Sequence, residues 1–389
     1  MDFVFTEEQQ MIRDTAAAFL EQASNSAAVR SAMVTELGYD PGLWRRICDE
    51  MVWPAIHIPL AYGGMGLGYV ELAATLEQMG RFLLCSPFYS TVCLGANALL
   101  IAANEIQKAR YLPQIAAGGL TASVAFMTAG REWDAGAIEV SAERDGDSFV
   151  LNGSYRYVPD GHSAELLVLA VRRPGSSGKD GISLLLLQPH DSSADGFSRH
   201  CLPTMDQTRK QAQLQFNHVR LPVASCLMGE EGEAWPRLEK ILNLAAIATA
   251  AEQLGGAQQI LDMTVSYTKE RVQFGRPVAG FQAVKHKAAD MMLQAEVARS
   301  AVYYAACVAD EALVGGPLAA ELGEAASVAK AWCSDAYFHN AATSLQLHGG
   351  VGFTWEYDVH LHLKRAKSTE QFLGNAAWHR ERLAALLLD

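Results

Sequence analysis

The 389-residue sequence lacks three features that would each point to a particular class of protein. No uninterrupted apolar run reaches the ~18 residues that a membrane-spanning helix needs. Lys and Arg number 31 against 43 Asp and Glu, and the net charge of −12 argues against a nucleic-acid-binding surface. The N-terminus has neither the basic region nor the apolar core of a signal peptide. We therefore expect a cytoplasmic chain with no membrane span and no nucleic-acid partner.

Cysteine is also sparse. The seven cysteines are an odd number, lie far apart and form no C-x-x-C pair, as expected of buried, reduced thiols. His360 and His362 are two residues apart, so on a helix they would point in different directions. The sequence predicts no metal site.

Hydrophobic periodicity divides the chain into three regions. Residues 1–118 follow a helical period, which begins with a capping-box pattern at Thr6 and Gln9. The glycine-rich residues 63–68 follow no predicted strand, so we interpret them as a loop between helices and not as a nucleotide-binding fingerprint.

Residues 119–228 change to a period of two, typical of a small β-barrel or sandwich. Strands are expected near 137–144, 148–153 (ending in a turn), 166–171 and 182–187. Residues 229–389 return to helical periodicity. Helices are expected at 235–271, 282–312 and 318–348, with a final helix ending near Leu388. The fold class is therefore α+β and multi-domain, with helical domains on both sides of a β-domain.

Four segments spread over the chain resemble those of acyl-CoA dehydrogenases. Residues 58–64 resemble the family's P-x-x-Y-G-G loop and residues 107–113 its Q-K-x-x-Y-L-P stretch. More specific are residues 271–282, similar to R-x-x-F-G…Q, and residues 346–353, similar to Q-x-x-G-G-x-G-F. The resemblance covers essentially the whole chain and implies a C-terminal four-helix bundle that carries the oligomer interface.

In the family, the last two segments reach across a subunit interface to the FAD of the partner chain. Arg271 offers a planar fork of donors to a diphosphate, and a glycine pair lets backbone N–H groups approach an anion. The resemblance assigns FAD contacts to Arg271, Phe274, Gln282, Gln346, Gly349 and Gly350. The alternatives are a surface ion pair of Arg271 with Glu270, and an ordinary helix-ending turn at the glycines.

The family's catalytic carboxylate is missing. In most members a Glu in a Y-E-G-T turn, following an R-D-A-K segment, removes the α-proton of the acyl thioester. Residues 364–367 match that lead-in, which places Leu373 at the Glu position. Some relatives carry the base on an earlier helix, where this chain has Ala245. Neither side chain can accept a proton.

The family's flavin-binding residues in the β-domain also differ. Residues 127–134 replace the T-E-P-G-A-G-S-D segment, and Trp133 takes the place of a small Ser. Pro159 takes the place of a Thr that bonds the flavin, and proline has neither an N–H nor a hydroxyl.

Two other acids are candidates for a relocated base. Glu252 lies seven residues after Ala245, on nearly the same helix face, and Glu370 lies three residues before Leu373. The alternatives are a partly buried, ion-paired Glu252 and a surface or interface Glu370.

The resemblance leaves three hypotheses. The first is a flavin-supporting subunit that pairs with a homologous chain in an α2β2 acyl-CoA dehydrogenase, like the non-catalytic chains of bacterial steroid side-chain degradation. The others are a self-sufficient dehydrogenase using Glu252 or Glu370, and a flavin-free scaffold. For an enzyme the implied partners are an acyl-CoA and an electron-transfer flavoprotein. Four small residues suit either a wide acyl pocket or close helix packing: Ala246, Ala248, Ala250 and Ala251.

Overall fold

The computed structural model describes residues 5–127, 133–189 and 195–388. These residues form two compact units. The helical unit falls within Met1–Ser31, Gly68–Leu84 and Ala246–Asp389, and the β-unit within Ala32–Leu67 and Cys85–Ala245. The division of the chain at residues 118 and 228 stays a prediction.

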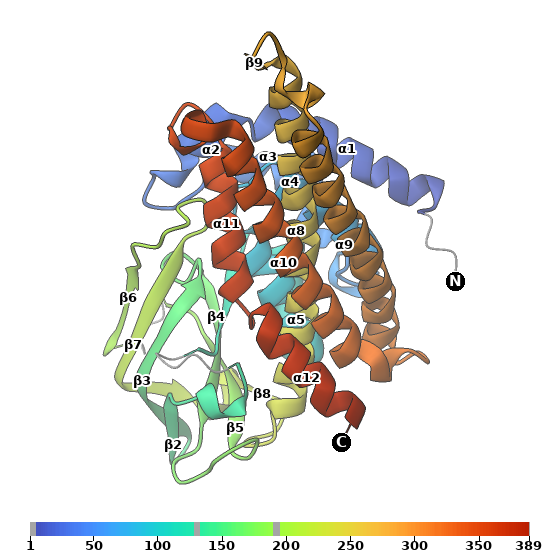
Figure 1. Ribbon diagram of the computed structural model, residues 1–389. Helices are drawn as coiled ribbons and strands as arrows, with labels where there is room; N and C mark the ends of the chain where they lie inside the picture. The colour runs from blue at the N-terminus through green and yellow to red at the C-terminus, as the bar shows by residue number, and fades with distance from the viewer. Residues whose placement is uncertain (1–4, 128–132, 190–194, 389) are drawn as a thin grey trace. The chain divides into compact units, whose positions relative to one another are not determined.

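The helical unit is built mainly from long helices (Figure 1). They are α1 (Glu7–Ala23), α4 (Tyr69–Arg81), the later part of α8 (Trp235–Glu270), α9 (Gln282–Val314), α10 (Leu322–His348), α11 (Val359–Gln371) and α12 (Ala376–Leu388). The short α2 (Ser26–Met33) begins in this unit. The predicted capping box is present at the start of α1, where Thr6 and Gln9 bond each other's backbone N–H. Helix α10 packs against α9, α11 and α12.

Helices α4 and α8 approach each other closely enough for their backbones to touch. A Cβ added at Gly80 would lie 1.9 Å from the Glu252 carbonyl oxygen, and one at Gly255 would lie 1.7 Å from that of Glu77. Only glycine fits at both positions. The neighbouring alanines of α8, at 246, 248, 250 and 251, are buried. They favour the interpretation of this stretch as a close-packing surface.

The β-unit contains one sheet with the strand order β6-β7-β3-β2-β4-β5-β8, and β1 pairs with β4. Its strands are β1 (Ala122–Ala125), β2 (Ser141–Asp145), β3 (Ser148–Pro159), β4 (Leu166–Arg172), β5 (Ile182–Leu187), β6 (Phe197–Cys201), β7 (Gln211–Pro222) and β8 (Leu227–Met228). Helical segments accompany it: α3 (Pro41–Asp49), a π-helix (Tyr89–Ala96), α5 (Asn97–Ala102), α6 (Glu105–Ala116) and α7 (Val223–Cys226).

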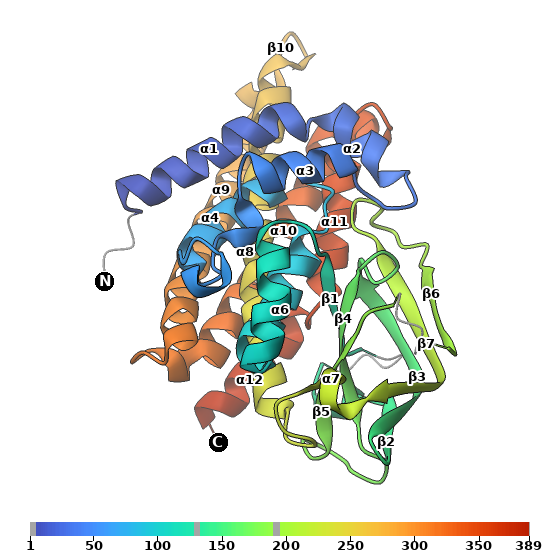
Figure 2. The ribbon, with the colours of Figure 1, turned by 180° about the vertical axis from the view of Figure 1, so that it is seen from behind.

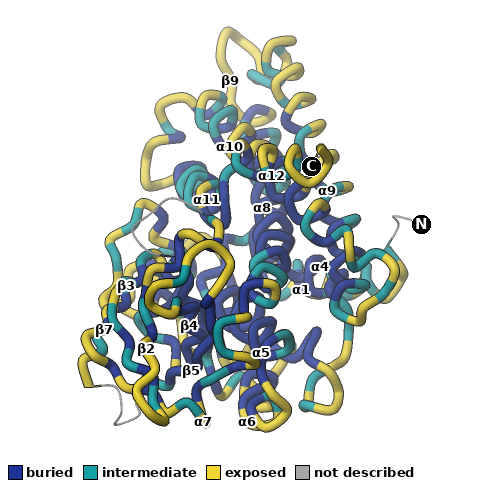
Figure 3. Tube along the Cα trace, turned by 90° about the horizontal axis from the view of Figure 1, so that it is seen from below, coloured by how far each residue is buried: buried dark blue, intermediate teal, exposed yellow. Residues whose placement is uncertain are grey.

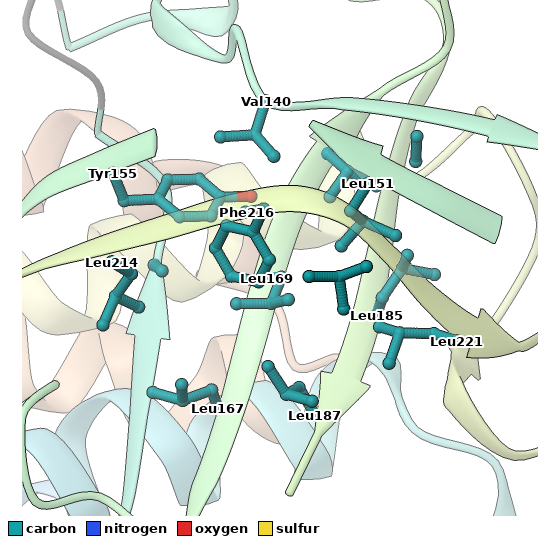
Figure 4. Packing of buried hydrophobic residues seen from close by; sticks show 14 of the residues in the cluster. Val140, Leu151, Tyr155, Leu167, Leu169, Leu185, Leu187, Leu214, Phe216 and Leu221 are labelled. Carbon is teal, nitrogen blue, oxygen red and sulfur yellow. The ribbon is translucent and has the colours of Figure 1, made fainter. Parts of the chain in front are cut away.

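Strands β3, β4, β5 and β7 enclose an apolar core (Figure 4). Tyr155 is fully buried in it and donates its hydroxyl to the carbonyl of Ala170 at 2.7 Å. Its ring meets Phe216 edge-on, with 5.7 Å between the ring centroids. The core therefore satisfies the one polar atom that Tyr155 brings into it.

One local prediction was wrong, and one helix was missed. Strand β3 does not end in a turn at Gly153 but continues to Pro159, because register shifts after Leu151 and Tyr155 bend it while its pairing with β7 resumes. The final helix, α12, ends at Leu388 as predicted, but the separate helix α11 that precedes it was not predicted. Phe372 follows the last residue of α11, and its extended backbone separates α11 from α12.

Within residues 5–127, 133–189 and 195–388, no helix is long and apolar enough to cross a bilayer. The same residues contain no group of three or more His, Cys, Asp or Glu placed to hold a metal ion.

Candidate functional site

A small hairpin projects beyond the ends of α8 and α9 (Figures 1 and 2). Its strands are β9 (Val272–Gln273) and β10 (Arg276–Pro277). The two turn residues, Phe274 and Gly275, both have positive φ, 53° and 76°, which a type I′ turn requires. Glycine accepts this conformation, but a bulky residue is strained in it. Phe274 is also 90% exposed, so the fold gains nothing from burying it. Strain and exposure together indicate a functional contact at this position.

Arg271 lies at the base of the hairpin, exposed to solvent. Its backbone N–H continues the helical bonding of α8 by donating to the carbonyl of Tyr267 at 2.9 Å. Among the described residues its guanidinium forms no ion pair, so the predicted alternative of a pair with Glu270 is not formed. The five donors of the side chain are therefore available to a ligand. Figure 3 shows the change from buried α8 to the exposed hairpin.

The second segment of the family pattern forms a turn at the end of α10. The helix ends at His348, and Gly349 follows with φ +63°. A Cβ added at Gly349 or at Gly350 would meet no atom within 4 Å, so both backbones face open space. Gln346 is exposed on the last turn of α10, and Gln282 is exposed at the start of α9. The turn ends a helix, as the alternative interpretation states, and it also leaves its backbone accessible.

Tyr267 joins these two segments. Its carbonyl accepts the Arg271 N–H, and its hydroxyl donates to the His348 carbonyl at 3.2 Å. Its ring stacks on the His348 ring, with 4.2 Å between the centroids. Arg271 and the glycine turn, which are 78 positions apart in the sequence, are thus held side by side. Sequence reasoning missed Tyr267, which matches no polar motif.

The turn between α11 and α12 carries Leu373, the residue that the sequence resemblance places at the position of the family's base. Leu373 is 4% exposed and has φ +62°, a left-handed conformation that a branched residue rarely adopts. Its carbonyl accepts a hydrogen bond from Nε2 of His379 at 2.9 Å. Burial lowers the pKa of His379 to about 3, so its ring is neutral at pH 7. The turn is therefore held by hydrogen bonds, and the side chain at position 373 cannot accept a proton.

Lys330 of α10 bonds the backbone of the same turn. Sequence reasoning missed this residue too. Its Nζ donates to the carbonyls of Glu370 at 3.2 Å and Gly374 at 2.9 Å, and to Oγ of Ser334 at 2.9 Å. The side chain is fully buried, which lowers the pKa of the ammonium to about 7.

The two candidate replacement acids have different surroundings. Both carboxylate oxygens of Glu370 are bound by Nζ of Lys367, at 2.9 and 3.1 Å. Glu370 is thus an ion-paired acid whose side chain is 17% exposed, so it is only partly accessible. Glu252 is 5% exposed on α8 and has interaction partners. Whether either acid acts as a base stays a hypothesis.

Two β-unit positions differ from the flavin-binding pattern that the resemblance predicts. Pro159 ends β3, is buried, and uses its carbonyl to accept the Ser123 hydroxyl at 2.6 Å. The ring of Trp133 lies 5.9 Å from that of Phe126, where the family pattern has a small residue. Of residues 127–134, positions 128–132 lie outside the described residues. Pro159 has no N–H and Trp133 has a single side-chain N–H, so both differ from the flavin-binding pattern that the resemblance predicts.

The second possible base position is enclosed. Ala245 is fully buried, and its carbonyl accepts the hydroxyl of Tyr89 at 2.9 Å. The guanidinium of Arg209 lies 4.5 Å from the centroid of the Tyr89 ring, in a cation–π contact. The Tyr89 hydroxyl thus bonds the backbone at Ala245, and Arg209 lies over the Tyr89 ring.

The hairpin and the glycine turn form a donor set that fits an anionic dinucleotide. An anion meets the unpaired guanidinium of Arg271, two exposed side-chain amides and the open backbone at Gly350, whereas the Gly349 N–H already donates to the Gln346 carbonyl. The open side-chain donors of the helical unit are therefore those of Arg271, Gln282 and Gln346.

Comparison with known proteins identifies the family. Residues 6–119 match the model for the acyl-CoA dehydrogenase N-terminal domain, and residues 232–388 match that for the acyl-CoA dehydrogenase C-terminal domain. Acyl-CoA dehydrogenase IpdE2 of Mycolicibacterium smegmatis is 31% identical over 98% of this chain and 99% of its own length. The Tcur3481–Tcur3483 steroid ACAD is similar in structure, with a TM-score of 0.85, 29% identity and 98% of each chain covered. The ChsE4–ChsE5 complex of Mycobacterium tuberculosis gives a TM-score of 0.87 at 25% identity, covering 100% of this chain and 99% of the other. The chain belongs to the acyl-CoA dehydrogenase family.

Proposed function

We propose that this chain is a flavin-supporting subunit of a heteromeric acyl-CoA dehydrogenase. It pairs with a homologous chain that carries the catalytic base, in an α2β2 assembly. The observation that carries the proposal is Leu373: the turn that holds the family's base is present and ordered, but its central side chain is a hydrocarbon. Such a side chain cannot remove a proton.

The donor set of the helical unit supports the second half of the proposal. Arg271, Gly349 and Gly350 would bind the diphosphate of the partner's FAD, and the exposed amides of Gln282 and Gln346 would bind its polar edges. Phe274 would supply an apolar contact from the hairpin tip. In the family, bound FAD supplies the acceptor for the β-hydride of an acyl-CoA, and an electron-transfer flavoprotein then accepts the electrons.

The relatives support a substrate class. One structural neighbour is described as a steroid ACAD, and another is a complex of two differently named chains. We infer that the assembly oxidises a bulky acyl-CoA, such as a steroid side-chain thioester, and that this chain contributes no proton-transfer group.

Co-expression tests the proposal. The chain produced with a homologue that has both the Glu and the T-E-P-G-A-G-S-D segment should purify as a yellow complex whose flavin bleaches with acyl-CoA. The chain alone should be colourless. Replacing the partner's Glu with Gln should abolish bleaching, whereas Glu252→Gln and Glu370→Gln in this chain should leave its rate unchanged.

The same experiment separates the other hypotheses. A yellow, active assembly of this chain alone, with bleaching lost in Glu252→Gln or Glu370→Gln, would establish a self-sufficient enzyme with a relocated base. A stable complex that holds no flavin would establish a scaffold. Either result would overturn the proposed subunit role.

A further inference from the structure

The hairpin carries a second arginine that the family pattern does not require. Arg276 begins β10, is exposed, and forms no ion pair among the described residues. Two unpaired guanidiniums on one short hairpin are unusual in a chain of net charge −12, where acidic partners are plentiful. Three exposed lysines, at positions 269, 285 and 287, add to the local positive charge. The electrostatic character of the hairpin is thus opposite to that of the whole chain.

The strand register places both arginines on one face. Arg276 lies opposite Gln273, and Pro277 lies opposite Val272. The Val278 N–H donates to the Arg271 carbonyl at 2.8 Å, which continues the pairing by one step. Residues directly opposite each other share a face, and so do residues two apart on one strand. Arg271, Gln273 and Arg276 therefore share a face, which we call the arginine face.

The separation of the two arginines suits a diphosphate. Diagonal neighbours on an antiparallel pair lie about 7–8 Å apart at the backbone, and the long side chains can converge from there. Each planar guanidinium can then bind one phosphate with two N–H donors. The amide of Gln273 lies on the same face and adds a neutral donor.

Arg276 is also ordered before any ligand arrives. Its guanidinium lies 4.0 Å from the centroid of the Phe281 ring, in a cation–π contact. The Phe281 ring in turn meets the Phe274 ring edge-on, at 6.1 Å and 90°. Holding the guanidinium against a ring reduces the entropy lost when it binds an anion. A solvated arginine with no function would have no need of this support.

We propose that Arg276 is a second phosphate-binding residue. With Arg271 and Gln273 it forms a face that binds the diphosphate of an adenosine-diphosphate coenzyme held by the partner chain. This inference rests on the proposed function and deepens it. FAD and coenzyme A both contain that diphosphate, and FMN does not, so the three compounds serve as probes.

The test uses the complex of this chain with its flavin-binding homologue, stripped of flavin and titrated with each probe. Arg276→Ala should weaken FAD binding by roughly 10- to 100-fold, the range for a lost charge-assisted pair of hydrogen bonds, and should leave FMN binding within about twofold. Arg276→Lys should lie in between, because it keeps the charge but not the fork. If coenzyme A binding weakens instead of FAD binding, the source is the acyl-CoA and the phosphate-binding role stands.

Lys285→Ala is the matched control, because it removes one exposed charge from nearby α9 without touching the arginine face. An equal loss of affinity in Lys285→Ala would show a long-range charge effect and overturn the proposal. So would unchanged binding of both FAD and coenzyme A in Arg276→Ala, while a wild-type complex that binds FAD keeps the proposed function intact. A wild-type complex that binds neither coenzyme would overturn both.

Discussion

The hairpin and the α11–α12 turn belong to the same helical unit, and both match segments of the family, yet they are opposite in character. On the hairpin, two guanidiniums are exposed and unpaired, and the turn residue Phe274 is 90% exposed. At the α11–α12 turn, Leu373 is buried and the carbonyls around it are bonded by Lys330 and His379. The hairpin leaves its guanidinium donors without an ion pair, whereas the donors near the α11–α12 turn bond the carbonyls of that turn.

This difference distinguishes a segment that serves ligand binding from a segment that serves folding. Exposed, unpaired charge and a strained exposed ring do not stabilise a fold, so their presence argues for binding. In the proposed function the turn has no proton-accepting side chain, but its hydrogen bonds secure two helices, so its presence argues for folding. Variants in the two segments should therefore have separable effects, on stability in one case and on flavin affinity in the other.

The largest effect is expected for Lys330→Met. Removing the ammonium leaves the buried carbonyls of Glu370 and Gly374 without a donor, at about 1–3 kcal/mol each, so the free energy of unfolding should fall by about 3 kcal/mol or more. Urea denaturation measures it. Lys367→Met, which breaks a partly exposed ion pair with Glu370, is the control and should cost about 1 kcal/mol or less. A loss below about 1 kcal/mol in Lys330→Met would mean that the turn does not depend on this lysine.

A second effect at the same residue depends on pH. Burial lowers the pKa of Lys330 from 10.5 to about 7, so between these values the unfolded chain holds a proton that the folded chain has released. Stability contributed by this group therefore rises with pH above about 7, by about 1 kcal/mol per pH unit, and levels off near the unfolded pKa. The observable is the difference in unfolding free energy between wild type and Lys330→Met at pH 7, 8 and 9. A difference that stays flat or falls with pH would show that the three hydrogen bonds keep the ammonium charged.

For the hairpin, Arg271→Ala should act on binding alone. The affinity of the complex for FAD should fall by roughly 10- to 100-fold, because charge-assisted hydrogen bonds to the diphosphate are lost. The unfolding midpoint should not change, since the guanidinium has no ion pair in the folded chain. Arg46→Ala, at an exposed i,i+4 pair on α3, controls for loss of surface charge. Unchanged FAD affinity would remove the hairpin from the flavin site, and a lowered midpoint would make Arg271 structural.

The sequence was sufficient to predict what depends on local pattern and on family motifs. The helix predicted at 235–271 is α8, Trp235–Glu270, and the capping box at Thr6 is present. Lys330 could not be predicted, because its carbonyl partners lie 40 and 44 residues further along the chain. In sequence it is simply a lysine on a helix, a residue type that is normally exposed.

The other misses have the same physical cause. The continuation of β3 past Gly153 depends on β7, about 60 residues away, which re-forms the ladder after each register shift. The role of Tyr267 depends on a backbone carbonyl 81 residues away, at His348. Motifs identify side chains that meet ligands, whereas the backbone acceptors that orient those side chains leave no trace in the sequence.

The smallest expected effect is a change in stability at Phe274, and whether stability rises or falls is what the experiment decides. Phe274→Asn places a residue that tolerates positive φ at the first position of a type I′ turn, and no buried apolar surface is lost because Phe274 is 90% exposed. The chain should gain about 0.5–1 kcal/mol of stability, measured as a higher melting temperature, and its complex should bind FAD more weakly. Phe353→Asn is the control: Phe353 is 72% exposed but has ordinary backbone angles, so its replacement should not stabilise the chain. A gain in stability together with a loss of affinity would show that the strain at the hairpin tip is retained for binding. Stabilisation without any loss of affinity would leave Phe274 without a ligand contact and weaken the contrast between the hairpin and the turn.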